Sequence, residues 1–100
     1  MTFANVGSLE AQPGRAADLV QILTRSNPDL SAVGCLAYAV GVDPDAPDTV
    51  LVSELWTSAE AHQASLTLPS VQAAIAEARP LLTGVMGGFR FAVQGSPLDT

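Results

Sequence analysis

The chain has 100 residues, of which 48% are hydrophobic and only 14% charged, and its net charge is −6. One domain fits this length, and so apolar a chain is expected to fold rather than stay disordered. All four basic residues are arginines, scattered along the sequence against ten carboxylates. Without a cluster of basic side chains, neither a nucleic acid nor an anionic membrane surface is an expected partner.

The single cysteine, Cys35, excludes an intramolecular disulfide and a multi-cysteine metal site. Residues 1–12 lack the basic start and continuous apolar run of a signal peptide, and no stretch of 18 apolar residues occurs. We therefore expect a cytoplasmic protein. The acidic residues within 43–48 lack the Gly and terminal Glu of a calcium loop, so no metal site is predicted there.

The first third of the chain predicts a strand and a helix. Residues 2–11 are rich in strand-forming side chains at first and contain no helix signal. Pro13-Gly14 then predicts the start of a helix, because Pro suits the first helical position. Asn27-Pro28 predicts its end, because a residue before Pro is pushed out of the helical region. A short irregular turn is expected to follow.

The middle of the chain predicts a hairpin. Residues 35–42 form a continuous apolar run after Gly34, which is typical of a buried strand. Residues 43–48 consist only of Asp, Pro and Ala, a composition that predicts a loop. Residues 49–56 predict the next strand, antiparallel to the first.

The last part predicts two helices and a strand. Thr57–Glu60 matches the capping-box pattern that starts a helix, and the helix is expected to break near Pro69. A second helix is predicted over about 69–79, ended by Pro80. Alternation over residues 89–94 predicts the final strand.

The order β, α, β, β, α(α), β predicts an α+β, ferredoxin-like βαββαβ domain: a four-stranded antiparallel sheet with helices on one face. The expected helix-to-sheet core is Leu19, Ile22, Leu23, Val71 and Ile75. Both faces of the two hairpin strands are apolar, yet the chain has helices for only one face. A second copy is the simplest cover for the other face, which predicts a homodimer.

Four segments of the chain carry a family resemblance, of which the run from Ser53 to Ala61 is the most specific. They are Pro13-Gly14-Arg15, Gly34-Cys35, Ser53-Glu54-Leu55-Trp56-Thr57-Ser58-Ala59-Glu60-Ala61 and Leu82-Thr83-Gly84. Together they resemble the antibiotic biosynthesis monooxygenase family of the dimeric α/β-barrel superfamily, over about residues 3–95.

The resemblance implies a function with three alternatives. The first is a cofactor-independent monooxygenase that oxidises a flat aromatic molecule, such as a phenol, anthrone or quinol, with O₂ and without metal or flavin. The second is a non-catalytic dimer that binds a small ligand or serves a stress response, which the lack of an Asn in residues 49–56 favours. Haem degradation ranks last, because residues 69–79 contain no His for the iron.

Three aromatic residues are the candidate catalytic groups. Trp56 could line the pocket and offer its indole N–H, or be a core residue at a strand end. Tyr38 is the single Tyr and lies in an apolar strand, so its hydroxyl needs a partner, either the substrate or the protein. His62, the single His, could deprotonate a phenol if it points under the helix; otherwise it is exposed.

Four further residues are candidates for substrate binding. Asn5 could reach the pocket from the first strand, and Val52 shares the face of Trp56 by alternation. Ser65 follows three positions after His62, where members of the family often have a His. Arg79 stands at the end of a helix, where the helix dipole also favours a cation.

Arg90 alternates with two phenylalanines in the last strand. We expect it to pair with Glu54, across the sheet or across the dimer, rather than to bind substrate.

Overall fold

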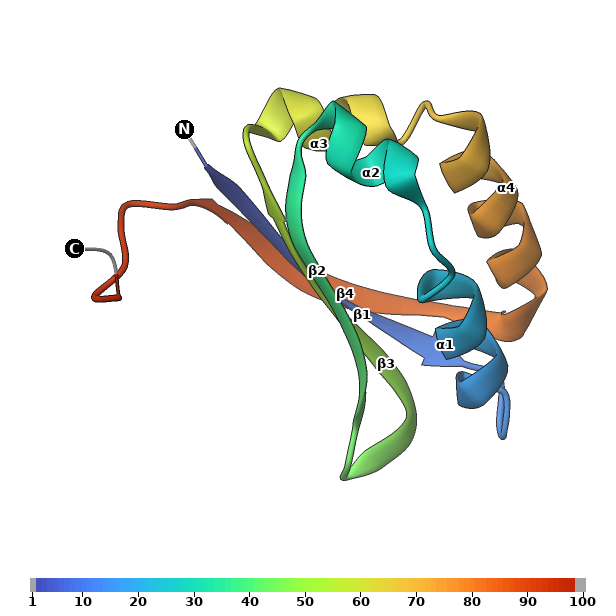
Figure 1. Cartoon of the computed structure of the whole chain (residues 1–100). Coiled ribbons are helices and arrows are strands. Elements are labelled where there is room, and N and C mark those ends of the chain that lie inside the picture. Colours follow the sequence, from blue (N-terminus) through green and yellow to red (C-terminus); the bar gives the residue numbers. More distant parts are fainter. Residues whose placement is uncertain (1, 99–100) are drawn as a thin grey trace.

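Four antiparallel strands form one sheet in the order β2-β3-β1-β4 in the computed structural model, which describes residues 2–98. The strands are β1 (Phe3–Ala11), β2 (Cys35–Asp43), β3 (Ala46–Trp56) and β4 (Leu82–Ala92). β1 and β3 lie at the centre of the sheet, and each is followed in the sequence by a helix (Figure 1). This confirms the predicted ferredoxin-like α+β fold.

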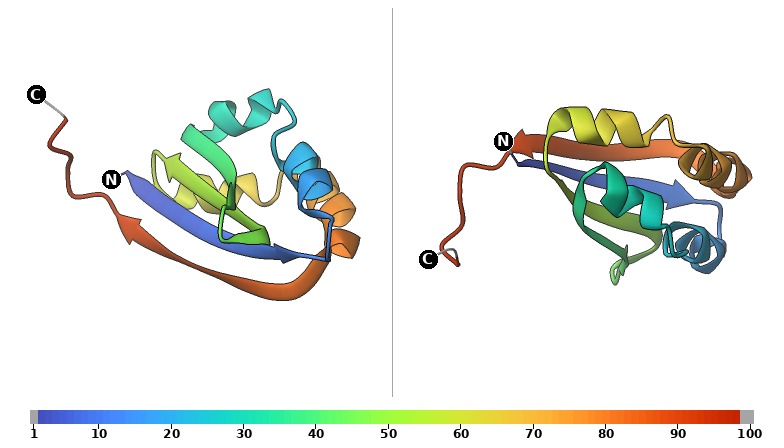
Figure 2. Two further views of the ribbon diagram at one scale, coloured as in Figure 1. Left: turned by 90° about the horizontal axis from the view of Figure 1, so that it is seen from below. Right: turned by 45° about the horizontal axis from the view of Figure 1, so that its top comes forward.

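The helices lie together on one face of the sheet, as both views of Figure 2 show. They are α1 (Ala16–Leu23), α2 (Pro28–Val33), α3 (Ala59–Ser65), α4 (Pro69–Ala78) and the single 3₁₀ turn η1 (Arg79–Leu81). The opposite face of the sheet is uncovered.

Helix starts differ from the prediction at two places. The segment predicted as an irregular turn is the helix α2, because Pro28 takes the first helical position and the side chain of Asn27 accepts the N–H of Asp29 at 3.1 Å. Pro28 therefore begins a helix as well as ending the one before it. Conversely, Gly14 lies in a turn with φ 76°, so α1 begins only after Arg15.

The start of α3 also corrects the capping-box prediction. Its first turn is capped by Ser58, whose Oγ accepts the N–H of Ala61 at 3.0 Å. Since Ala61 rather than Glu60 stands three residues after the cap, no reciprocal side-chain bond can form.

The hairpin strands and β4 are longer than predicted. The hairpin loop is only Pro44 and Asp45, because pairing continues to Asp43 and resumes at Ala46. β4 begins at Leu82 rather than at residue 89. Gly88 belongs to the strand with φ 141°, and a Cβ there would collide with the carbonyl oxygen of Val6, so the glycine permits close strand pairing rather than flexibility.

The main core lies where α1 and η1 cover β1 and β3. It is built around Leu19 and Val50, which have no exposed surface. Ile22 and Leu23 pack against this cluster, whereas Ile75 is 43% exposed, so its prediction as a core residue was wrong. The reason is that α4 packs on α1 and continues into η1 instead of resting on the strands.

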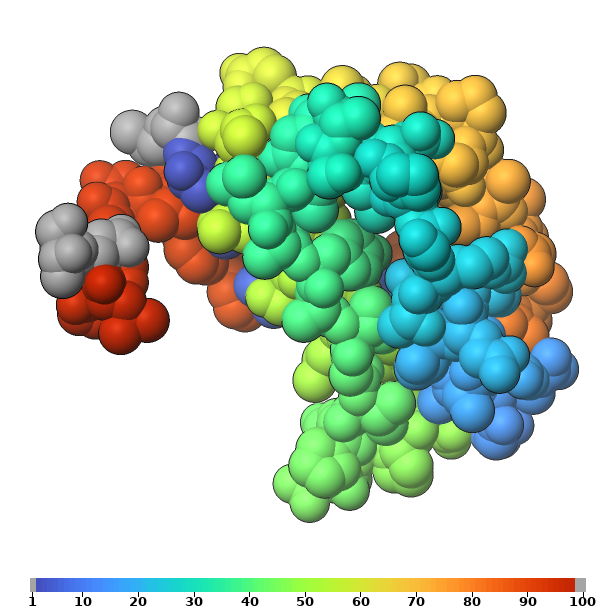
Figure 3. All heavy atoms as spheres, viewed as in Figure 1, coloured from blue at the N-terminus to red at the C-terminus, as the bar shows by residue number. Residues whose placement is uncertain are grey.

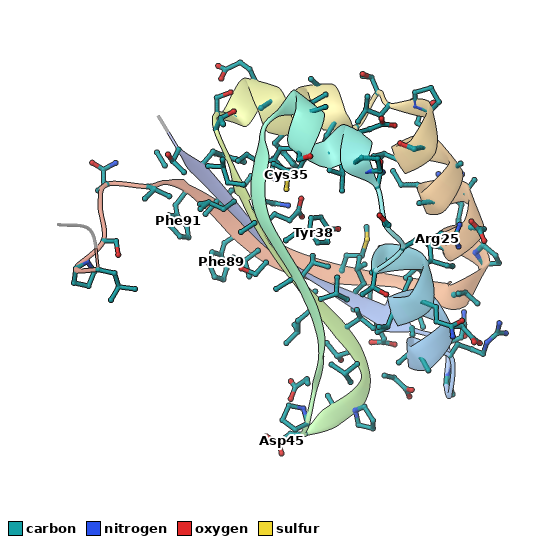
Figure 4. The ribbon with its side chains drawn as sticks, viewed as in Figure 1. Arg25, Cys35, Tyr38, Asp45, Phe89 and Phe91 are labelled. Atoms are coloured by element: carbon teal, nitrogen blue, oxygen red, sulfur yellow. The ribbon has the colours of Figure 1, made fainter. Side chains whose placement is uncertain are left out.

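The uncovered sheet face is apolar. Phe89 and Phe91 of β4 stack with ring centroids 6.4 Å apart, and both are at least half exposed. Figure 4 shows them on the opposite side of the sheet from Tyr38. A hollow of about 440 Å³ lies on this face, with Ala39 and Leu55 among its lining residues.

Candidate functional site

Four polar side chains form a row across the helix-facing side of the sheet. Strand register makes Tyr38 the partner of Glu54, Glu54 the partner of Asn5, and Asn5 the partner of Arg90, one from each strand. Side chains of direct partners share a face, and Val52 and Trp56, which alternate with Glu54, are buried beneath the helices. Figure 4 shows Tyr38 pointing from β2 into the space between sheet and helices.

The carboxylate of Glu54 is the centre of this row. Asn5 Nδ2 donates a hydrogen bond to Glu54 Oε2 at 2.8 Å, and Trp56 Nε1 donates one to Glu54 Oε1 at 3.1 Å. Glu54 is only 9% exposed, and neither ion pair within residues 2–98 includes it. A buried carboxylate needs hydrogen-bond donors in place of the water that it loses, and Asn5 and Trp56 supply two of them.

The pKa of the Tyr38 hydroxyl is raised in the same environment. Burial raises the pKa of its hydroxyl to about 12, and the negative charge of Glu54 adds to the effect. The hydroxyl therefore keeps its proton at neutral pH and can act as a hydrogen-bond donor. Cys35, at the start of β2, has its pKa raised by the same two causes, so it remains a thiol.

His62 and Trp56 form an aromatic cluster beside the row. Trp56 is 1% exposed, and its ring contacts the His62 ring edge-on, with the centroids 5.4 Å apart and the ring planes at 63°. The ring of Phe3 also contacts His62, with the centroids 5.7 Å apart. His62 is thus buried on the side of α3 that faces the sheet, and its Nδ1 has no hydrogen-bond partner. Ser65 donates its hydroxyl to the carbonyl of His62 at 2.6 Å, a bond within the helix.

The structure therefore gathers most of the predicted site residues on one side of the sheet. Asn5, Tyr38, Val52, Trp56 and His62 all lie there. Ser65 is buried beside them, but its hydroxyl is committed to the backbone.

Arg79 and Arg90 lie apart from the carboxylate of Glu54. Arg79 is exposed at the start of η1, next to the end of the sheet where Ala11 pairs with Leu82, whereas Glu54 pairs near the other end of β1. Arg90 makes no ion pair with Glu54 within the chain, because Asn5 occupies the strand between them. Arg90 instead remains an exposed cation at the β4 end of the polar row.

Glu54 is the site residue that sequence reasoning missed. The signal was present: a carboxylate on the inward face of a strand, flanked on that face by Val52 and Trp56. We expected its carboxylate to pair with Arg90, whereas Asn5 and Trp56 are the residues that donate hydrogen bonds to it.

The helical layer does not cover the row completely. Tyr38 faces the helices but is 38% exposed, whereas Glu54 beside it is only 9% exposed. The space-filling view in Figure 3 shows β2 and α2 in contact and a narrow hollow where they meet α1.

Residues 2–98 contain neither a metal-binding cluster nor a membrane-spanning helix. No group of three or more His, Cys, Asp or Glu side chains is placed to hold a metal ion. No helix in that part of the chain has the length and apolar character needed to cross a membrane.

This geometry defines an α+β domain with a carboxylate-centred polar site beneath its helices, and comparison with known proteins gives it a family. The family model described as "Antibiotic biosynthesis monooxygenase" matches residues 2–77, and the chain belongs to this family. Curated proteins give no match.

Solved structures agree with this assignment. A Chloroflexus aurantiacus protein named as an antibiotic biosynthesis monooxygenase is 38% identical over 96% of both chains, with a TM-score of 0.79. A similarly named Deinococcus radiodurans protein is 29% identical, over 96% of this chain and 95% of that one, with a TM-score of 0.75. Rv0793 of Mycobacterium tuberculosis shares the fold at a TM-score of 0.81 and 18% identity, over 97% and 99% of the two chains.

Proposed function

We propose that the protein is a cofactor-independent monooxygenase that oxidises a flat aromatic phenol, anthrone or quinol with O₂. The observation that carries the proposal is the Glu54 carboxylate, buried under the helices and held by Asn5 and Trp56 without an ion-pair partner within residues 2–98. Ligand sites typically combine apolar walls with a small number of polar groups at defined positions. Membership of the antibiotic biosynthesis monooxygenase family supports the same class of reaction.

Cofactor-free oxygenation needs only a few features from the protein. Triplet O₂ reacts with a closed-shell molecule only after electron transfer, so the substrate must first become an electron-rich anion. The anion needs a donor near its oxygen, and the Tyr38 hydroxyl supplies one because its pKa of about 12 keeps it protonated. Arg90 adds a positive charge to the same row, and Val52 contributes apolar surface for O₂ and the rings.

The atoms of the reaction balance with O₂ as the oxidant. An anthrone methylene loses a proton, and its carbanion adds O₂ to form a peroxide. The peroxide regains the proton and eliminates water, which leaves a carbonyl group. The net change is CH₂ + O₂ → C=O + H₂O.

Oxygen uptake tests the proposal. Metal-stripped protein is mixed with 1,8-dihydroxyanthrone and with hydroquinones, and uptake is compared with the autoxidation blank. Uptake well above the blank with at least one substrate is the expected result. A rate equal to the blank for all of them contradicts the enzyme and leaves a module that binds a small aromatic ligand.

We also propose that the chain acts as a homodimer through the uncovered sheet face. Its stacked Phe89 and Phe91 and the exposed Leu51 form an apolar surface that a second copy would remove from water. The site lies on the opposite side of the sheet, so each subunit keeps its own site.

A further inference from the structure

We infer that Glu54 is the general base of the proposed reaction and that Asn5 and Trp56 hold its carboxylate in place for this role. The inference rests on the proposed function, since it names the group that removes the substrate proton. It replaces His62, the residue that the sequence alone favours as the base.

The hydrogen bonds of Glu54 fix its carboxylate but leave it able to accept a proton. An ionised carboxylate offers about four lone-pair positions. Asn5 occupies one on Oε2 and Trp56 one on Oε1, and no third donor side chain within residues 2–98 bonds to it. Each oxygen therefore keeps an acceptor position, and the two donors act from β1 and from β3 itself.

The neighbours of Glu54 place a substrate within its reach. Tyr38 is its direct partner on β2, and the charge of Glu54 contributes to the raised pKa of the Tyr38 hydroxyl, so the two groups lie close enough to act on one bound phenol or enol. The hydroxyl of Tyr38 stays protonated, so it binds the anion rather than competing for the proton. Donor and base thus face the same substrate edge.

His62 is less suited to the role. Its Nδ1 is buried and unpartnered, and its ring contacts Phe3 and Trp56. Nδ1 is enclosed, so it cannot contact a ligand unless the cluster opens. His62 therefore acts as a packing residue that supports the Trp56 ring.

In the inferred step the Glu54 carboxylate takes one proton from the substrate, and the electron pair of the broken O–H or C–H bond stays on the aromatic system. The anion passes an electron to O₂, and a C–O bond forms to give the peroxide. The carboxylic acid of Glu54 then returns its proton to the peroxide, which loses water. Glu54 ends the cycle ionised.

The test compares Glu54→Gln, Glu54→Asp and the control Glu60→Gln, which removes one carboxylate from the exposed start of α3. Gln is close in shape to Glu, and the Asn5 amide can turn over to bond to it. Oxygen uptake with 1,8-dihydroxyanthrone gives kcat, and anaerobic calorimetry with the same compound gives Kd. Loss of a general base costs about 10²–10⁴-fold in rate, so Glu54→Gln is expected to lose at least about a hundredfold in kcat with Kd changed less than about threefold.

Each other outcome overturns the inference. If Glu54→Gln keeps more than about a tenth of the wild-type kcat, or if Kd weakens in parallel with the rate, Glu54 is not the base. Should Glu54→Gln fail to fold, Glu54→Asp decides, because it keeps the charge but withdraws the carboxylate; its kcat is expected to fall at least about tenfold with binding retained. Wild-type protein that matches the blank removes the proposed function itself, a result separate from any effect of the variants.

Discussion

Glu54 lies on β3 between Val52 and Trp56, and its bond to Asn5 joins residues that are 49 positions apart in the sequence. Alternation along β3 was enough to predict that Val52, Glu54 and Trp56 share a face. It was not enough to predict the bond, because the bond depends on the register between strands that are distant in sequence. This is why the sequence identified Trp56, Tyr38 and Asn5 as candidates but missed the carboxylate that connects them.

The raised pKa of Tyr38 predicts its titration. The chain has a single Tyr, so absorbance at 295 nm reports that hydroxyl alone. With a pKa of about 12, roughly a tenth of the folded protein should be ionised at pH 11, against roughly nine tenths of the protein in urea at a pKa of about 10. Equal ionisation in the two states at pH 11 would contradict the buried environment.

The raised pKa of Tyr38 also determines the direction in which the free energy of unfolding changes with pH. Between pH 10 and 12 the folded state keeps a proton that the unfolded state has lost, so stability is complete below pH 10 and falls as pH rises through this window. The free energy of unfolding should therefore fall less steeply for Tyr38→Phe than for wild type over pH 9–11, measured by urea titration.

His62 tests the division of roles within the aromatic cluster. If the ring serves packing against Phe3 and Trp56, His62→Phe should keep at least about a third of the wild-type oxygen uptake. A fall of tenfold or more in a variant that still folds would return the role of base to His62.

At the scale of elements, the hydrophobic pattern predicted every strand and both long helices, whereas caps and glycines were misread. Asn27-Pro28 was interpreted as a helix end alone, although the Asn27 side chain caps the next helix. The final strand was predicted over residues 89–94, although Gly88 already belongs to β4, where it lies against the backbone of β1. Such features depend on tertiary contacts that a local pattern does not contain.

A pair of substitutions tests the observed core. Leu19→Ala removes a side chain with no exposed surface and should lower the free energy of unfolding by about 2–5 kcal/mol. Ile75→Ala removes one that is 43% exposed, so its effect should be about 1 kcal/mol or less. Urea titration of both variants measures the difference. Equal losses would mean that α4 rests on the sheet more closely than described.

At the scale of the whole molecule, the two sheet faces have different uses. The helix-covered face carries the polar row, and the uncovered face carries exposed aromatic side chains (Figure 4). The apolar pattern of both hairpin strands already predicted that two layers of cover are needed. It could not predict how closely the helices cover the sheet, because that depends on how α4 packs on α1 and η1 rather than on the strands.

Sedimentation tests the predicted dimer. Wild type at micromolar concentration should sediment at about twice 10.3 kDa. Phe91→Asp places a charge in the uncovered face and should shift the mass toward the monomer, whereas Leu66→Asp, at the end of α3, should not. A monomeric wild type would contradict the homodimer.

The central claim is that an aromatic ligand binds beneath the helices against the Glu54 row. The most direct measurement is an anaerobic NMR titration with 1,8-dihydroxyanthrone, because the single Trp gives one indole N–H signal and that N–H donates to Glu54. We predict that the Trp56 indole signal and the Asn5 side-chain amide signals shift together as ligand is added, while the ring protons of Phe89 and Phe91 do not. Shifts confined to the two Phe rings, with the indole signal unchanged, would place the ligand on the uncovered face and contradict the account.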